Sequence, residues 1–327
     1  MDNLNDDALR HLNERDKQYG LNTVDDVKPE EPTVVEPQFI NREVYSTSVA
    51  DQPTWKLLDI STLPSGGLMY PIDSEIAIRS AKAKEIRHWS TIDEEDPIDV
   101  SDKINFILNA CTKFTSDSSR IKLNYKDFCK VDRYHILFRI YELTFPNQEN
   151  KLFANIKCLN PKCGTINKTQ ILTPTLKGFD YPDELMKWYS PEERCFKIVS
   201  EKLDEVFELY LPTIGTDDKF KNKRRQEEQS SIDIDKAFYS FGPYLINDWR
   251  GLDSQTISSI KLGSFDWPDN KFMFIHKFTK QLEDSSINKG VSHCSKCKEV
   301  TESHIFLGGS FTVKDIFIVS TRLDELI

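Results

Sequence analysis

Apolar residues recur at helical spacing in the first half of the chain. Residues 101–114 carry them three or four positions apart, which gives a helix with one apolar face: Ile104, Ile107, Leu108, Cys111 and Phe114. We therefore expect a helix over 101–114, capped by Asp99 or Ser101. A second helix is expected over 125–142, and a shorter one over 81–89.

Alternation of apolar and polar residues indicates strands elsewhere. Residues 75–79 (EIAIR) alternate, and a turn signal with Gly66 and Gly67 precedes them. Residues 152–158 alternate again, and further strands are expected over 165–172, 196–200 and 206–211. Helices return over the segments 217–240, 253–262 and 268–283. This order of elements favours an α+β fold.

Charge is concentrated at the N-terminus. The net charge is -10, and residues 1–50 hold 11 Asp or Glu against 5 Lys or Arg, with several prolines. Such a segment has little to offset its ordering entropy, so we expect a disordered acidic arm, either solvated or ordered on a partner. The arm is too polar for a secretory signal, and no apolar stretch in the chain approaches the roughly 18 residues of a membrane span.

Beyond the N-terminal arm the chain is close to balanced in charge, and a basic run at 219–225 is the one local exception. Glu227 and Glu228 follow it, so pairing along a helix favours a solvated face over contact with nucleic acid or with an acidic partner. The whole chain lacks the basic footprint that binding to a phosphate backbone requires.

Four of the seven cysteines have the spacing of metal ligands. Cys158 and Cys163 are separated by four residues, and Cys294 and Cys297 by two. Thiolates at such spacing can supply two corners each of a tetrahedral zinc site. Gly164 suits the first turn because glycine permits positive φ. With all four positions filled by protein, the zinc ion is expected to be structural; His293 and His304 are reserve ligands. The other cysteines, Cys111, Cys129 and Cys195, lie in hydrophobic segments and are expected in the core.

Known catalytic patterns are missing from the sequence. No phosphate-binding glycine loop, nucleophile elbow, HExxH, kinase or EF-hand motif occurs, and the six histidines are dispersed. We therefore predict no enzyme, no catalytic residues and no small-molecule substrate. We predict three regions: a disordered arm (1–50), an α-rich region opening with a short strand and turn (51–145), and a zinc-stapled α+β region of zinc-ribbon type (146–327).

Several short motifs, taken in order, resemble one family. LPSGGLMYP (63–71) followed by EIAIR, then DKIN (102–105), then Asp132-Arg133 with Arg139, resemble the conserved segments of T-even-type bacteriophage baseplate hub assembly proteins. The two cysteine pairs and the segment 309–311 complete the order, over roughly residues 55–315. The acidic arm is additional, and Met69 stands where the family usually has an aromatic residue.

The resemblance implies a structural or assembly protein of the baseplate hub of a contractile-tailed phage. Its partners would be other hub and tail proteins, with self-association as a further possibility. It would be found in the virion tail baseplate, in the host cytoplasm during assembly, or in both. The alternative is a zinc-ribbon viral protein associated with nucleic acid, such as a transcription or packaging factor; salt-dependent binding lost on neutralising 221–225 would favour it.

Overall fold

The computed structural model describes residues 54–146, 152–170, 173, 176–177, 181–200, 205–286, 289–304 and 316–317. The predicted arm, residues 1–50, lies outside this part of the chain. Pro53–Ile327 form one compact unit. Helices and strands are mixed in it, which confirms the α+β class, and the predicted boundary between residues 145 and 146 stays a prediction. None of the helices described is long and apolar enough to span a bilayer.

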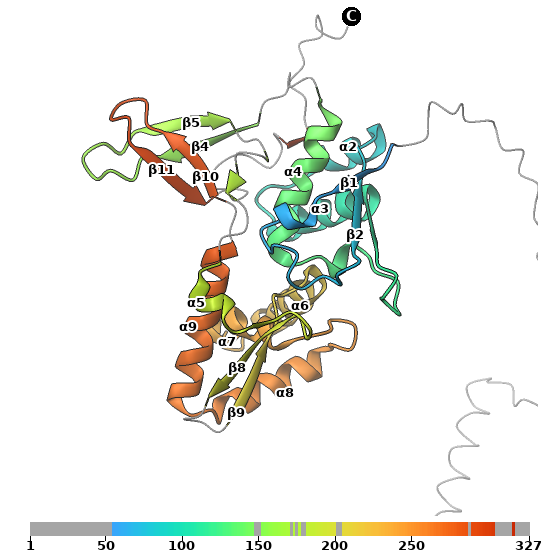
Figure 1. The fold of residues 1–327 in the computed structure, drawn as a ribbon, viewed down its shortest axis with the longest axis vertical. Helices are drawn as coiled ribbons and strands as arrows, with labels where there is room; N and C mark the ends of the chain where they lie inside the picture. The colour runs from blue at the N-terminus through green and yellow to red at the C-terminus, as the bar shows by residue number, and fades with distance from the viewer. Residues whose placement is uncertain are drawn as a thin grey trace, which may run out of the picture. The chain divides into compact units, whose positions relative to one another are not determined.

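A small antiparallel sheet and three helices make up the first part of this unit (Figure 1). The strands, with β2 in the centre, are β1 (Lys56–Leu58), β2 (Glu75–Ile78) and β3 (Thr112–Thr115). The helices are α2 (Ala83–Trp89), α3 (Pro97–Cys111) and α4 (Arg133–Thr144). Their apolar faces are buried together, as the helical spacing predicted; Ile104, Ile107 and Leu108 of α3 are almost fully buried.

The structure corrects two expectations about these helices. Helix α3 begins at Pro97, with Asp96 as its cap, and ends at Cys111, where the chain turns into β3; Asp99 and Ser101 do not cap it. Proline suits the first turn of a helix, where its missing N–H has no intrahelical partner.

The expected helix over 125–142 is interrupted. Short 3-10 turns at Tyr125–Asp127 and Lys130–Asp132 precede α4. Between them the backbone is extended, because it pairs with a distant segment: Lys130 N–H donates to Pro212 O (2.7 Å), and Ile214 N–H donates to Phe128 O (2.8 Å). Tertiary hydrogen bonding overrides the helical pattern here.

A second antiparallel sheet is covered by aromatic side chains of a long helix. Its order is β7 (Tyr189–Ser190), β8 (Cys195–Ser200), β9 (Glu205–Leu209). The helices around it are α5 (Asp183–Met186), α6 (Ile214–Gln229), α7 (Lys236–Phe241), α8 (Ser254–Phe265) and α9 (Asp269–Ser286). Phe196 of β8 meets Phe278 of α9 edge to face, with ring centroids 5.7 Å apart. The single helix expected over 217–240 is two helices, α6 and α7.

Two hairpins stack on each other in the remaining module (Figure 1). One is β4 (Phe153–Lys157) with β5 (Ile166–Gln170); the other is β10 (Lys289–His293) with β11 (Val300–His304). The short strand β6 (Leu176–Lys177) joins the second hairpin along β10. The alternation predicted from Leu152 onward is confirmed, since Leu152, Ala154 and Ile156 are buried. Cys111, Cys129 and Cys195 are buried too, as expected.

Candidate metal centre

The four cysteines with ligand spacing lie close together, although the two pairs are about 130 residues apart in the sequence. Their sulfur atoms all lie within 4.8 Å of one another. The Sγ atoms of Cys158 and Cys297 are 3.6 Å apart, and so are those of Cys163 and Cys294. Four sulfurs about 2.3 Å from a central ion, at the corners of a tetrahedron, would be about 3.8 Å apart. The group could therefore hold one metal ion.

Each cysteine pair sits in the turn of its own hairpin, and the two turns are built alike. Cys158 N–H donates to Thr165 O (2.8 Å), and Cys294 N–H donates to Glu299 O (2.9 Å). The residue after the second cysteine has positive φ in both: Gly164 at 59° and Lys298 at 64°. The predicted role of Gly164 is confirmed. That of Lys298 was missed, because lysine gives no local signal for this conformation.

Polar contacts join the two hairpins beside the sulfurs. Asn167 Oδ1 accepts from the N–H (2.9 Å) and the hydroxyl (3.0 Å) of Ser295. Thr169 donates from its hydroxyl to Ser292 Oγ (2.7 Å), and Asn160 Nδ2 donates to Glu299 Oε2 (2.7 Å). These contacts fix the turns against each other, so that the thiols of one hairpin face those of the other.

Hydrogen bonds from nearby groups prepare two of the thiols for ligation. The Cys297 N–H, directed at the Cys294 sulfur, lowers the pKa of the Cys294 thiol to about 6. Hydrogen bonding from Thr165 lowers the pKa of the Cys163 thiol. For Cys297, the Glu299 N–H acts to lower the pKa, but partial desolvation and hydrogen bonds to the neighbouring thiols, which need its proton, raise it to about 12. A cation must therefore displace protons as it binds, which makes its affinity pH-dependent.

The surroundings of the thiols are basic and partly open. Cys158 and Cys294 are buried, Cys163 is half-buried and Cys297 is exposed. Four lysines that flank the cysteines in the sequence are all at the surface, where their charge partly offsets that of the thiolates: Lys157, Lys162, Lys296 and Lys298. The reserve ligand His293 is exposed and is not part of the cysteine group; the side chain of His304 lies outside the described residues.

A buried carboxylate joins the motifs that carried the family resemblance. Asp132 is fully buried, and Oδ1 accepts from Ser65 N–H (2.8 Å). Oδ2 accepts from the hydroxyls of Ser65 (2.7 Å) and Tyr70 (2.6 Å), and Tyr70 in turn accepts from Cys129 N–H (2.9 Å). Burial raises the pKa of Asp132 to about 6, although the two hydroxyls act to lower it.

The neighbouring residue, Arg133, connects this buried site to the DKIN motif (102–105). Arg133 is buried, and its Nη2 donates to the carbonyl (2.7 Å) and hydroxyl (3.0 Å) of Ser101 and to Asn105 Oδ1 (2.7 Å). Hydrogen bonds to Asp132 and to its neighbour Arg133 thus bring residues from LPSGGLMYP and DKIN together at this pair, and we call the two sets of bonds the motif network. No local pattern in the sequence indicates that these motifs would touch.

Comparison of the chain with protein-family models, with curated proteins and with solved structures finds no match.

Proposed function

We propose that this chain is a non-enzymatic assembly protein of the baseplate hub of a contractile-tailed phage, with one structural zinc ion on Cys158, Cys163, Cys294 and Cys297. The observation that carries the proposal is the convergence of four cysteine sulfurs from two hairpins. Four thiolates in a tetrahedral arrangement suit zinc, and they leave no position for water or substrate. Such a site stabilises a fold and has no place for hydrolytic chemistry.

The motif network supports a structural role as well. Ser65, Tyr70 and Asp132 have the residue types of a catalytic site, but all three are buried and are satisfied by one another. Their hydrogen bonds hold the LPSGGLMYP segment (63–71) against the start of α4. The resemblance to hub assembly proteins rests on these residues, and it supports other hub and tail proteins as partners.

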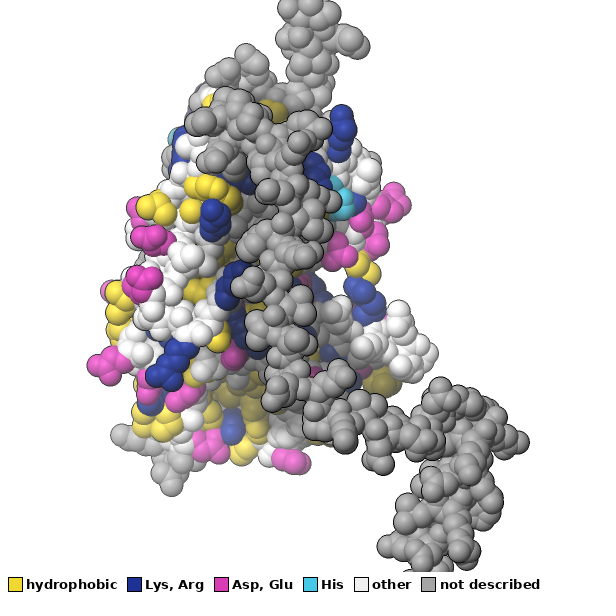
Figure 2. Space-filling model, turned by 90° about the vertical axis from the view of Figure 1, so that its right-hand side faces the viewer, with side chains coloured by type: hydrophobic (Ala, Val, Ile, Leu, Met, Phe, Trp, Pro, Cys, Tyr) yellow, Lys and Arg dark blue, Asp and Glu magenta, His cyan; other side chains and the backbone are white. Residues whose placement is uncertain are grey.

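The nucleic-acid alternative receives less support from the surface. On α6 three of the five cations of the basic run are paired with acidic side chains: Lys221 with Asp217 (2.6 Å), Lys223 with Glu227 (3.8 Å) and Arg224 with Glu228 (2.8 Å). On the face drawn in Figure 2, the basic and acidic side chains of the described residues are interspersed. A phosphate backbone would meet both signs of charge there.

The test is made on particles of the source phage. We expect mass spectrometry to detect the chain in purified virions or in tail-assembly intermediates from infected cells. A phage encoding Cys163→Ser together with Cys297→Ser should accumulate unfinished baseplates, whereas Cys195→Ser, outside the metal group, should assemble. Normal tails from the double variant, or from a phage lacking the chain altogether, would contradict the proposal.

A further inference from the structure

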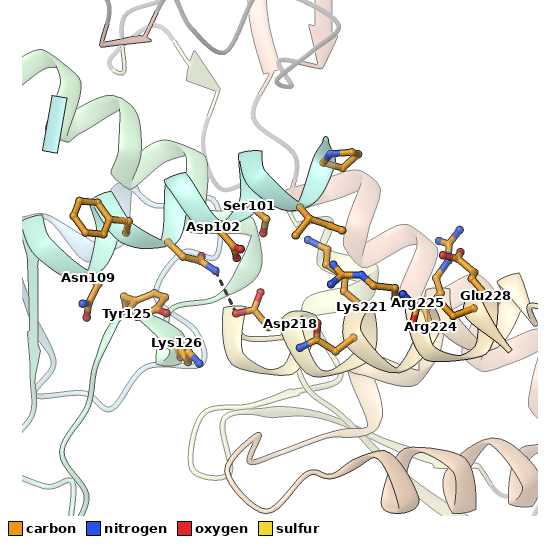
Figure 3. A pocket seen from close by; sticks show the side chains of 16 residues that line it. Ser101, Asp102, Asn109, Tyr125, Lys126, Asp218, Lys221, Arg224, Arg225 and Glu228 are labelled. Carbon is orange, nitrogen blue, oxygen red and sulfur yellow. Dashed lines mark hydrogen bonds and ion pairs between the residues drawn. The ribbon is translucent and has the colours of Figure 1, made fainter. Parts of the chain in front are cut away.

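A groove of about 1100 Å³ lies between α3 and α6 and includes none of the four metal-site cysteines. Figure 3 shows side chains of both helices pointing into it from opposite walls. Its volume is slightly above the roughly 300–1,000 Å³ of pockets that enclose small molecules. A helix of about 10 Å diameter fills roughly 120 Å³ per residue, so the groove has room for about nine residues of polypeptide.

The walls are rich in side-chain amides at helical spacing. Helix α3 contributes Asn105 and Asn109, four residues apart, and α6 contributes Asn222 and Gln229, seven apart. These residues lie on the polar faces of helices whose other faces are in the core. Amides both donate and accept hydrogen bonds, so this wall suits a ligand that also does both, as a peptide does.

The floor of the groove is tied to the buried motif network. Asn105 Nδ2 donates to Asp218 Oδ2 (3.3 Å), and Asn105 Oδ1 accepts from the buried Arg133. Burial raises the pKa of Asp218, although the nearby Arg133 acts to lower it. The position of these groups is therefore set by the core and does not depend on solvent-exposed rotamers.

Two of the four cations lining the groove make no ion pair within the part of the chain that the structure describes. Lys221 is paired with Asp217 and Arg224 with Glu228. By contrast, Arg225 and Lys126 make no ion pair with any described residue. Lys126 lies over the Trp249 ring, 5.4 Å from its centroid, and its charge acts on the Asp218 carboxyl without direct contact. Lys126 and Arg225 are half-buried, and cations without an ion pair at the wall of a groove favour a ligand that brings its own carboxylates.

We propose that this groove binds a short acidic segment of a partner protein, with carboxylates against Arg225 and Lys126 and peptide groups against the amides. Asp102, Asp218 and Glu228 also line the groove, which disfavours a continuous polyanion such as nucleic acid. The inference rests on the proposed assembly role for its biological meaning, and it does not depend on the identity of the metal.

The test uses the full-length, metal-loaded protein and fluorescence anisotropy. The probe is a fluorescein-labelled twelve-residue helical peptide with Glu at i, i+4 and i+7 and with Ala and Leu elsewhere; the comparison peptide has Gln in place of Glu. We expect the Glu peptide to bind about ten-fold more tightly at low salt. Lys126→Glu together with Arg225→Glu should abolish that preference. The control is Lys219→Glu, which lies on α6 like Arg225 but outside the groove lining and should retain the preference for the Glu peptide.

Four results would overturn the inference. One is equal binding of the two peptides, and another is a preference that survives the double charge reversal. The third is a preference seen only after removal of residues 1–50, which would assign the groove to the chain's own acidic arm. Tighter binding of a 16-base-pair DNA duplex through Lys126 and Arg225 would also contradict it. All of these measurements are independent of particle assembly, so failure here is distinct from failure of the proposed function.

Discussion

Tyr70→Phe removes one hydroxyl from the network around Asp132. That hydroxyl donates to the carboxylate at 2.6 Å and accepts from the Cys129 N–H at 2.9 Å. Its loss leaves a buried amide unsatisfied, at about 1–3 kcal/mol, and removes a bond to a charged group worth about 1.5–3 kcal/mol. Because the two contributions overlap, we expect the free energy of unfolding to fall by about 3 kcal/mol, and Tm by roughly 6–12 °C.

The loss should also depend on pH. The pKa of Asp132 is raised to about 6 in the folded state, above its unfolded value, so the buried carboxylate costs stability above that pH. Tyr70 acts to lower this pKa, so removing its hydroxyl adds to the cost above pH 6 and adds less near pH 4.5, where the carboxyl is protonated.

Urea unfolding at pH 7.5 and pH 4.5 measures both effects. The matched control is Tyr134→Phe, because Tyr134 lies nearby on α4 and its hydroxyl bonds to no other described residue. We expect this control to stay within about 0.5 kcal/mol of wild type. A Tyr70→Phe protein as stable as wild type at pH 7.5, or a loss equal in the two variants, would refute the reasoning.

Two further predictions concern the same unit. Asp132→Asn removes the titrating carboxyl. The free energy of unfolding of the wild type, relative to this variant, should therefore fall by about 3 kcal/mol as pH rises from about 4 to 6. A difference measured by urea unfolding that does not change with pH would contradict the burial of Asp132. Gly215→Ala would place a Cβ 2.4 Å from the Trp249 ring and should destabilise by about 1–3 kcal/mol. Gly263→Ala is also within a helix, but nothing lies within 4 Å of the added Cβ, so this variant should be neutral or stabilise by up to about 1 kcal/mol. Calorimetry that finds the same stability for the Gly215 and Gly263 variants would count against the packing of α6.

The sequence predicted best where the determining interactions are local. The cysteine spacings, Gly164 and the alternation of 152–158 are set within single hairpins, and the structure places them as expected. The start of α3 was misplaced although its signal was local: Asp96 followed by Pro97 is a strong helix start.

Long-range pairing explains what the sequence could not indicate. The break before α4 arises because residues 128–130 bond to 212–214, which no local pattern reveals. The same holds for Ser65 and Tyr70, which meet Asp132 more than 60 residues later. The α3–α6 groove was missed for another reason: its amides and charges, read singly, are those of any solvated helix face.

The metal content of the purified full-length chain tests the central claim most directly. Inductively coupled plasma mass spectrometry should find about one zinc per chain in wild type and in Cys195→Ala, and almost none in Cys163→Ser with Cys297→Ser. Removing the zinc with a chelator should lower Tm, because metal binding at such a site contributes folding free energy. Wild-type protein isolated without bound metal, or zinc retained at full stoichiometry in the double variant, would contradict a four-cysteine zinc centre.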